Sequence, residues 1–173
     1  MQEVLKYLHS DQRIYVAGSS NEPTGLLRDL AASALPENLE FIQFPLPGLN
    51  RTDFTQFNDT ASVTTFFMSS ALAKGDAARV NYLPMQMRAT YDYLATNVDV
   101  YLLQVAYDQE SRLRVGPNVD FHESVLAQNP TVIAQLNPSM VAPAGSPLMN
   151  PALIDVMIEN DVSAPALAPA TID

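Results

Sequence analysis

The sequence contains no cysteine among its 173 residues. Disulfide bonds, thiolate zinc sites and cysteine nucleophiles are therefore excluded, and this composition suits a reducing compartment, so we expect a cytoplasmic protein. Cationic residues are scarce, because 9 Lys and Arg stand against 19 Asp and Glu, which gives a net charge of −10. Nucleic-acid binding needs basic patches, so this balance argues against a nucleic-acid partner.

Long hydrophobic runs are missing as well. No stretch reaches the ~20 apolar residues that a membrane-spanning helix needs, and the first residues lack the apolar region of a secretory signal. His9 and His122 have no second ligand at useful spacing, and Asp92, Asp99 and Asp120 are scattered in the sequence rather than clustered. We therefore expect no membrane association and no metal.

The length of 173 residues fits one domain, and 47% hydrophobic residues suffice for a core that needs no covalent staples. We expect this domain to span residues 1–161. Residues 162–173 are rich in alanine and proline with little charge, a composition typical of a semi-rigid linker. We expect this linker to lead toward a carboxyl-terminal half that the sequence does not contain.

Two apolar runs, Val98–Ala106 and Thr131–Leu136, dominate the second half of the chain. Near-continuous apolar strands are buried on both faces, which is typical of a parallel sheet covered by helices. The first run stops at Tyr107 and Asp108, and the second stops at residues 137–140. Ligands of such sheets lie beyond the carboxyl ends of the strands. The sequence therefore predicts an α/β fold, with an open, mostly parallel sheet, helices on both faces and a site at the strand ends.

The other segments alternate between strand and helix patterns. Arg13–Ala17, Thr24–Leu35 and Leu39–Phe44 predict one βαβ unit with a right-handed crossover. Pro45–Thr60 has no sustained period and predicts a long loop. The remaining expected elements are helices over Gln2–His9, Ser69–Lys74, Met85–Ala95 and Asp120–Ala127, strands over Val63–Phe67, Val80–Leu83 and Ala152–Ile158, and a hairpin return at Leu113–Val115.

Three local features carry more specific expectations. Gly75 stands where a glycine in left-handed conformation ends a helix. Asp120 precedes Glu123 by three residues, the spacing of a capping box. Four phenylalanines are more often core residues than a substrate-facing wall, and they are Phe54, Phe57, Phe66 and Phe67.

Five segments occur together in an order that resembles a known family. They are Gly18–Pro23 with the leucine-rich helix after it, Phe66 and Phe67 with a short helix, Arg79–Pro84, Asp99–Asp108 followed by Gly116, and Val132–Met140 followed by Gly145. The chain resembles the amino-terminal half of the acetyl-CoA hydrolase/CoA-transferase family, which includes acetate, propionate and 4-hydroxybutyrate CoA-transferases. The resemblance implies a CoA-transferase-like α/β fold and coenzyme A, bound as an acyl-CoA substrate.

The resemblance also implies a covalent mechanism. In that family a glutamate attacks the thioester and gives a mixed anhydride and then a glutamyl-CoA thioester, which splits one difficult acyl transfer into easier steps. That glutamate belongs to the carboxyl-terminal half. Glu159-Asn160-Asp161 resembles its context, but Asp161 replaces the glycine, so the role is not carried over. We expect the 173-residue chain alone to be inactive, with partners that are acyl-CoA, a short carboxylate and its own second half; homo-oligomerisation is left open.

The chain departs from the family pattern at three positions. Ser111 and Arg114 stand where the family usually has a glycine and a serine in the turn after the aspartate. Val141 stands where a proline commonly follows the Asn-Pro-x-Met sequence. These departures indicate a divergent subgroup.

The candidate site residues follow the predicted strands. The N–H groups of Gly18–Pro23 are placed to receive a carboxylate or phosphate, provided Glu22 points away; the alternative is a plain β–α turn. Ser19 or Ser20 as a nucleophile is disfavoured, because the chain has neither a nucleophile elbow nor a paired histidine. The candidate CoA-binding residues are Gly18, Ser19, Ser20, Pro84, Met85, Asp108, Gly116, Asn137 and Met140, and no catalytic residue is expected in this chain.

For several of these residues a structural role competes with the functional one. Asp108 either orients the catalytic loop of the second half or caps a turn, and the turn is favoured. Asn137 and Met140 either line the acyl pocket or close the sheet, and the pocket is slightly favoured. Two other functions compete with acyl-CoA chemistry: a non-catalytic binding module and a sugar-phosphate isomerase. Only the half-enzyme requires a flat apolar face for a second half.

Overall fold

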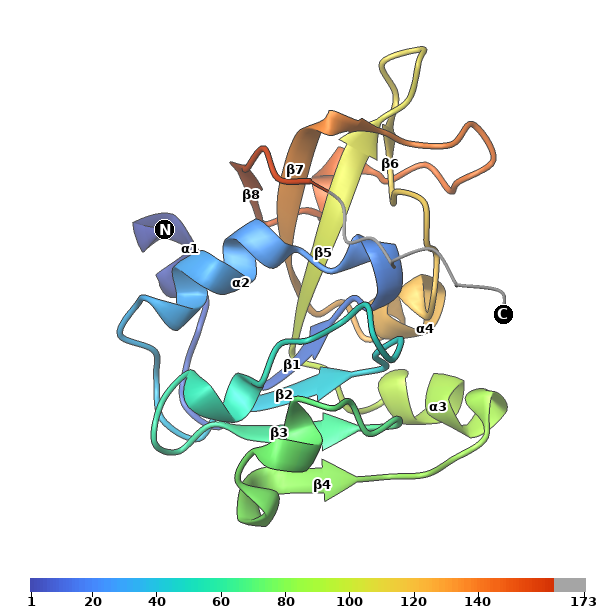
Figure 1. Ribbon diagram of the computed structural model, residues 1–173. Coiled ribbons are helices and arrows are strands. Elements are labelled where there is room, and N and C mark those ends of the chain that lie inside the picture. Colours follow the sequence, from blue (N-terminus) through green and yellow to red (C-terminus); the bar gives the residue numbers. More distant parts are fainter. Residues whose placement is uncertain (164–173) are drawn as a thin grey trace, which may run out of the picture.

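The computed structural model describes residues 1–163 (Figure 1). The predicted linker, residues 162–173, falls almost entirely outside this range. One eight-stranded sheet has the order β4-β3-β2-β1-β5-β7-β8, in which these strands run parallel, and β6 pairs antiparallel with β5. The strands are β1 (Arg13–Val16), β2 (Glu40–Gln43), β3 (Ser62–Thr65), β4 (Val80–Tyr82), β5 (Val100–Tyr107), β6 (Leu113–Arg114), β7 (Thr131–Val141) and β8 (Val156–Glu159).

Within residues 1–163, four short α-helices and five single 3-10 turns precede or connect these strands. The expected open α/β architecture with a mostly parallel sheet is confirmed, and so is the hairpin return, which is β6. The helices are α1 (Gln2–Leu5), α2 (Thr24–Ala31), α3 (Met87–Leu94) and α4 (His122–Leu126), and the 3-10 turns are η1 (Ser19–Asn21), η2 (Phe54–Gln56), η3 (Leu72–Lys74), η4 (Ala77–Arg79) and η5 (Pro151–Leu153).

The order of the strands creates one switch point. From β1 the chain builds outward through β2, β3 and β4, and then returns to place β5 on the other side of β1. The connections after β1 and β5 therefore diverge at the carboxyl edge of the sheet. In open α/β sheets this is where ligands bind.

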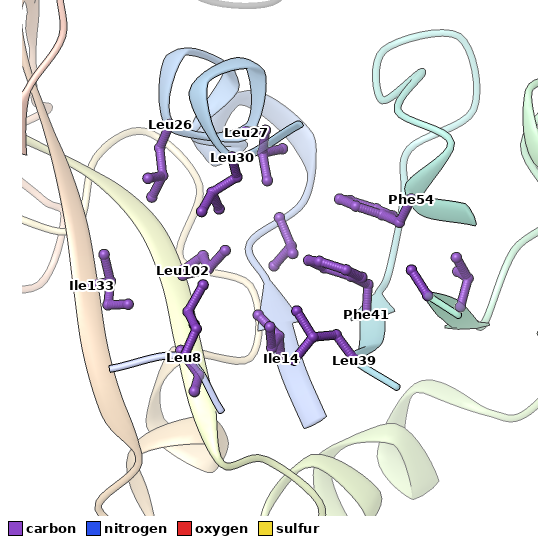
Figure 2. Close-up of a cluster of buried hydrophobic side chains, with 14 of the residues drawn as sticks. Leu8, Ile14, Leu26, Leu27, Leu30, Leu39, Phe41, Phe54, Leu102 and Ile133 are labelled. Carbon is purple, nitrogen blue, oxygen red and sulfur yellow. The ribbon is translucent and has the colours of Figure 1, made fainter. Parts of the chain in front are cut away.

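Helices cover both faces of the sheet because side chains alternate along each strand. Ile14 and Val16 of β1 face α1 and α2, whereas Tyr15 and Ala17 face α3 and α4. On the first face, α2 buries Leu26, Leu27 and Leu30 against strand residues that include Leu102 and Ile133 (Figure 2). Burial of one such side chain contributes about 1.5–3 kcal/mol, so this face holds α2 firmly in place.

The long β7 corrects the expectation that this strand ends at Leu136. It continues through residues 137–140 to Val141, which pairs with Tyr107. The register shifts between Val105 and Tyr107 of β5, so that β7 bulges over these extra residues. A proline is tolerated there because a bulge leaves ladder positions unpaired.

Several helix ends also differ from the expectations. The first helix stops at Leu5, and the second stops at Ala31 rather than Leu35. The expected helix before Gly75 is only the turn η3, with Gly75 at φ −78°, outside the left-handed region. Asp120 caps no helix and forms no capping box with Glu123, because the N-cap residue is Phe121 without a side-chain bond. Tertiary contacts occupy Asp120 instead.

The last expected strand also begins later than its apolar pattern suggested. Residues 151–153 form η5, capped by the side chain of Asn150, and the strand runs from Val156 to Glu159. Three of the four phenylalanines pack in or against the core as expected, whereas Phe67 is 46% exposed. No helix among residues 1–163 is long and apolar enough to span a membrane.

Candidate functional site at the carboxyl edge of the sheet

The centre of the switch point is a buried network of three amides: Gln104 of β5 and Gln135 and Asn137 of β7. The Gln104 Oε1 accepts from the Gln135 Nε2 at 2.8 Å and from the Asn137 Nδ2 at 3.0 Å. All three side chains are buried. Buried amides are costly unless their hydrogen bonds are satisfied, so this network fixes the two strand ends relative to each other.

The amide network extends to the amino end of α2. Pro23, at the N-cap of this helix, offers no side-chain acceptor. The Leu26 N–H donates instead to the Gln135 Oε1 at 2.7 Å. A residue of a distant strand thus satisfies one of the N–H groups that a helix leaves unpaired in its first turn.

The network also reaches the turn that follows β1, residues 18–22, here named the β1 turn. Gln104 Nε2 donates to the Ser20 carbonyl at 3.3 Å. Asn50 clamps Ser19 twice, because its Oδ1 accepts from the Ser19 N–H at 2.8 Å and its Nδ2 donates to the Ser19 carbonyl at 3.0 Å. Ser19 has φ +53°, so this clamp fixes a conformation that side chains rarely adopt.

Internal partners already occupy several N–H groups of the β1 turn. The Ser19 N–H donates to Asn50, and the Asn21 N–H donates to the Gly18 carbonyl. These two donors face protein acceptors rather than a ligand, and Gly18 itself lies against the Asp120 carboxylate. The geometry at these positions is that of a structural β–α turn, and the half-buried Ser19 and Ser20 side chains remain at its surface.

Asn21 ties the β1 turn to the segment after β6. Its Nδ2 donates to the carbonyls of Val115 and Gln104, at 2.5 and 3.3 Å, and its buried Oδ1 has no protein partner. Gly116 lies against this oxygen with φ +102°, and a Cβ on Gly116 would approach the Oδ1 to 2.5 Å. Only glycine fits this position, so Gly116 belongs to the packing of the β1 turn.

Glu22 points into the protein and away from the surface of the turn. Its side chain is 2% exposed and accepts from the Gln43 Nε2 at 2.9 Å. Burial raises the pKa of Glu22, and hydrogen bonds from Gln43, Asn50 and Thr52 oppose the rise. The expectation that Glu22 must be turned away from a bound anion is met.

Asn137 and Met140 lie at the tip of β7. Besides its bond to Gln104, the Asn137 Nδ2 donates to the Val162 carbonyl at 2.7 Å. Met140 Sδ lies 3.8 Å from the Gln104 Nε2. The segment after β8 therefore crosses the tip of β7, and Asn160 packs directly on Gly25 of α2.

Asp108 belongs to a separate cluster on the β5–β6 hairpin. It accepts from the N–H groups of Glu110 and Arg112 and pairs with the guanidinium groups of Arg112 and Arg114. Burial by itself raises the pKa of a carboxyl, but these donors hold the pKa of Asp108 well below its usual range. The turn role that the sequence favoured is the one the contacts describe.

Arg114 adds a buried cation at this hairpin. Its side chain is 8% exposed, against 43% for Arg112, and it also donates to the Ser146 carbonyl. A cavity of about 330 Å³ lies next to it, lined by residues 108–110, Arg112 and residues 141–144. The departures at Arg114 and Val141 thus lie at or beside this cavity.

Pro84 and Met85 are not brought to the same place. They follow β4, which is separated from β5 by β3, β2 and β1. With strands about 4.8 Å apart, they lie more than about 14 Å from the switch point, on the same edge of the sheet. The structure brings together Gly18, Ser19, Ser20, Gly116, Asn137 and Met140 through contacts with one another or with Gln104 and Asn21.

Sequence reasoning missed Gln104, Gln135 and Asn50, which organise this site. A signal was present for the first two, because each is a glutamine inside an otherwise apolar strand, and they are register partners in the parallel sheet. A polar residue inside a buried strand needs a partner, which predicts that two such strands pair at these positions. Asn50 carried no such signal.

Comparisons with known proteins identify related folds but no sequence relatives. No protein-family model matches the chain, and no curated protein matches it. Among solved structures, RipA from Yersinia pestis superposes with a TM-score of 0.80 at 17% identity, over 99% of this chain and 44% of RipA. A 4-hydroxybutyrate CoA-transferase from Porphyromonas gingivalis gives 0.65 at 14% identity, over 98% of this chain and 40% of that one.

An acyl-CoA transferase from E. coli, solved as a thioester complex with CoA, superposes with a TM-score of 0.64 at 13% identity. It matches 92% of this chain and 48% of its own length. The fold is that of CoA-transferases. The expected resemblance is confirmed at this level, and the chain spans less than half the length of each of these CoA-transferase-like neighbours, in agreement with a match to one half.

Proposed function

We propose that this chain forms one half of an acyl-CoA hydrolase or CoA-transferase, which moves CoA between a short acyl group and a carboxylate or water. The observation that carries the proposal is the switch point, where buried amides fix the β1 turn and the tip of β7 in a sheet shared with CoA-transferases. Ser19, Ser20 and Met140 then line one side of the acyl-CoA cleft. Pro84 and Met85 contribute at its far end.

The nucleophilic carboxylate in this proposal comes from polypeptide outside the chain. Among residues 1–163, three carboxylates near the strand tips are engaged: Glu22 with Gln43, Asp108 with two arginines, and Asp120 with Tyr15. Glu159 and Asp161 are exposed, but they lie on or directly after the edge strand β8. A carboxylate that is already hydrogen-bonded or ion-paired is a poor nucleophile, which supports a nucleophile supplied by a second half.

A row of aromatic contacts that ends in exposed side chains supports a second half that covers it; Phe44 and Phe121 join the row at 5.0 Å. Phe67 forms an edge contact with Phe44, whose ring centroid is 4.9 Å away, and Tyr91 of α3 forms one with Phe121 at 4.7 Å. Leu46 follows Phe44 closely in sequence. Large apolar side chains gathered on one surface mark interaction sites more often than isolated ones do. The exposed large apolar side chains in or near these aromatic contacts in sequence are Leu46, Phe67, Met68, Met87, Tyr91 and Val119.

Thermal unfolding in the presence of CoA, acetyl-CoA and sugar phosphates tests the proposal. A ligand that binds the native state raises its stability by mass action, by about 2.7 kcal/mol at 100 times the Kd. CoA and acetyl-CoA are expected to raise the unfolding temperature, and sugar phosphates are not. Stabilisation by sugar phosphates alone would favour an isomerase, and the absence of any shift would favour a non-catalytic module.

Matched methionine variants locate the site within this experiment. Met140→Ala removes a side chain at the tip of β7, whereas Met157→Ala removes one that is 45% exposed on the edge strand β8. The first variant is expected to weaken the CoA-dependent shift, and the second is expected to keep it. Thioester hydrolysis by the 173-residue chain at a rate above background would contradict the placement of the nucleophile.

A further inference from the structure

Gly18 is the first residue of the β1 turn, and other parts of the protein pack closely against it. A Cβ on Gly18 would lie 2.3 Å from the carbonyl oxygen of Phe44 and 3.6 Å from the Asp120 Oδ2. The Asp120 carboxylate therefore lies against Gly18, and the Gly18 carbonyl accepts from the Asn118 Nδ2 at 3.4 Å. Gly18 is therefore held between the end of β2 and the loop that precedes α4.

Asp120 makes this attachment from an unusual backbone conformation. Its φ is +46°, a left-handed conformation that residues other than glycine adopt uncommonly, although aspartate adopts it more readily than most. Its Oδ2 accepts from the hydroxyl of Tyr15, a fully buried residue of β1, at 3.0 Å. One carboxylate thus joins the interior of β1 to the first residue of the turn that follows it.

We propose that Asp120 is a positioning residue of the acyl-CoA site, and that its carboxylate sets the place of Gly18 and thereby of the β1 turn. The role in catalysis rests on the proposed function. The contacts of Asp120 with Tyr15 and Gly18 are present in the chain itself. Asp120 does not touch the reacting atoms and acts only through the turn.

The surroundings of Asp120 make its contact with Gly18 dependent on pH. Burial raises the pKa of Asp120 to about 6, and the hydrogen bonds from Tyr15 and Gly18 limit the rise. Tyr101 of β5 also faces it, and burial raises the pKa of that phenol. His122 of α4 lies 3.4 Å from the Tyr101 hydroxyl, and burial lowers its pKa, with Glu123 opposing. The phenol of Tyr91 on α3 also raises the pKa of Tyr15.

Nuclear magnetic resonance of the Gly18 amide tests the inference without any ligand. In the unmodified 173-residue chain, the Gly18 N–H resonance is expected to shift with a midpoint near pH 6, because ionisation of Asp120 places a charge beside Gly18. In Asp120→Asn the shift is expected to vanish. A Gly18 resonance that stays constant between about pH 4.5 and 7.5, or that titrates equally in Asp120→Asn, would overturn the proposal.

Asp155→Asn is the matched control for this substitution. The Asp155 side chain accepts from the Val132 N–H at 2.8 Å, near the amino end of β7 and at the opposite edge of the sheet. This variant loses a comparable carboxylate but is expected to keep the Gly18 titration. If it abolishes the titration as Asp120→Asn does, the shift reports general loosening and the proposal fails.

Two further measurements keep the proposal testable if Asp120 variants fold poorly. Tyr15→Phe removes one donor to the charged carboxylate, so the Gly18 midpoint is expected to move above its original pH. Hydrogen exchange at the Asn21 N–H, which donates to the Gly18 carbonyl, is expected to quicken roughly tenfold in Asp120→Ala and to change little in Asp155→Asn. A lower Gly18 midpoint in Tyr15→Phe, or an unchanged Asn21 exchange rate, would contradict the inference. Neither result depends on CoA binding, so a failure of the proposed function is seen separately.

Discussion

Gln104 and Gln135 are register partners in adjacent parallel strands, and the Gln135 side chain connects the Gln104 amide to the first turn of α2. Three elements that are far apart in the sequence are thereby locked at the switch point. The lock is made of neutral amides, so its strength is expected to be independent of pH and of salt. It explains how a turn with few apolar contacts of its own is held in one place.

Gln135→Leu is expected to destabilise the chain. The substitution removes the acceptor of the Leu26 N–H and a donor to Gln104, and a buried polar group left without a partner costs about 1–3 kcal/mol. Urea unfolding followed by circular dichroism measures the difference. Gln109→Leu, which changes an exposed glutamine, is the control and is expected to stay within about 0.5 kcal/mol of the original chain. Equal midpoints for the two variants would show that the network adds no stability.

Two glycine-to-alanine variants separate a crowded position from an open one. Gly18→Ala places a Cβ against the Phe44 carbonyl oxygen, and such overpacking against backbone typically costs about 1–3 kcal/mol. Gly145→Ala meets nothing within 4 Å and is expected to be neutral or slightly stabilising. Urea unfolding measures whether Gly18→Ala is the less stable variant. The midpoints are compared provided the dependence of the unfolding free energy on urea concentration is the same in both. A Gly18→Ala variant as stable as Gly145→Ala would mean that Phe44 and the β1 turn move apart easily.

Arg114→Ala is expected to destabilise the hairpin more than Arg112→Ala. Arg114 is the more buried of the two cations paired with Asp108, and its loss removes the buried guanidinium from that carboxylate and from the Ser146 carbonyl. Urea midpoints at neutral pH measure the order. Equal losses in both variants would indicate that solvent replaces either guanidinium equally well.

The same pair predicts an acid dependence. Because the pKa of Asp108 is lowered in the folded protein, its stabilisation is present above the ordinary value of 3.8 and is lost as the pH falls through the lower folded value. Unfolding free energy measured from neutral to acidic pH should therefore fall less steeply in Arg114→Ala than in the original chain. A steeper fall in the variant would contradict this account of Asp108.

Asp120 predicts a pH dependence of the unfolding free energy that has the opposite sign. Its pKa rises from the ordinary 3.8 to about 6, so its protonated form stabilises the fold below 3.8, and this contribution is lost as the pH rises through about 6. Between about pH 4 and pH 7, the unfolding free energy of Asp120→Asn should rise by on the order of 2 kcal/mol relative to that of the original chain. Thermal or urea unfolding across this range measures the difference, and a constant difference would contradict the raised pKa.

The sequence predicted the sheet well because buried parallel strands have a simple pattern. The runs around Leu102 and Ile133 are apolar, and they did become neighbouring strands, β5 and β7. The end of β7 was missed because Asn137 and Pro138 resemble a turn when only neighbours in sequence are considered. Their strand conformation depends on the pairing of Val141 with Tyr107, a contact that no local pattern encodes.

The site was predicted less completely than the fold. Gly18 and Asn137 were candidates because they follow predicted strand ends, and Gly116 was one through the family resemblance. Pro84 and Met85 followed a strand end too but lie far from the switch point. The order of strands in the sheet, rather than the end of any one strand, decides which tips meet. Asp120 had a local interpretation as a helix cap, and its contacts with Tyr15 and Gly18 come from residues more than 100 positions away.

The unequal lengths of the strands give the carboxyl edge a high side and a low side. β5 and β7 extend with the β6 hairpin well beyond the tips of β1 to β4, which are three or four residues long (Figure 1). A partner domain that approaches the switch point therefore meets the long strands β5 and β7 on one side and only short strands on the other. We expect such a domain to approach over the short strands and the aromatic side chains beside them.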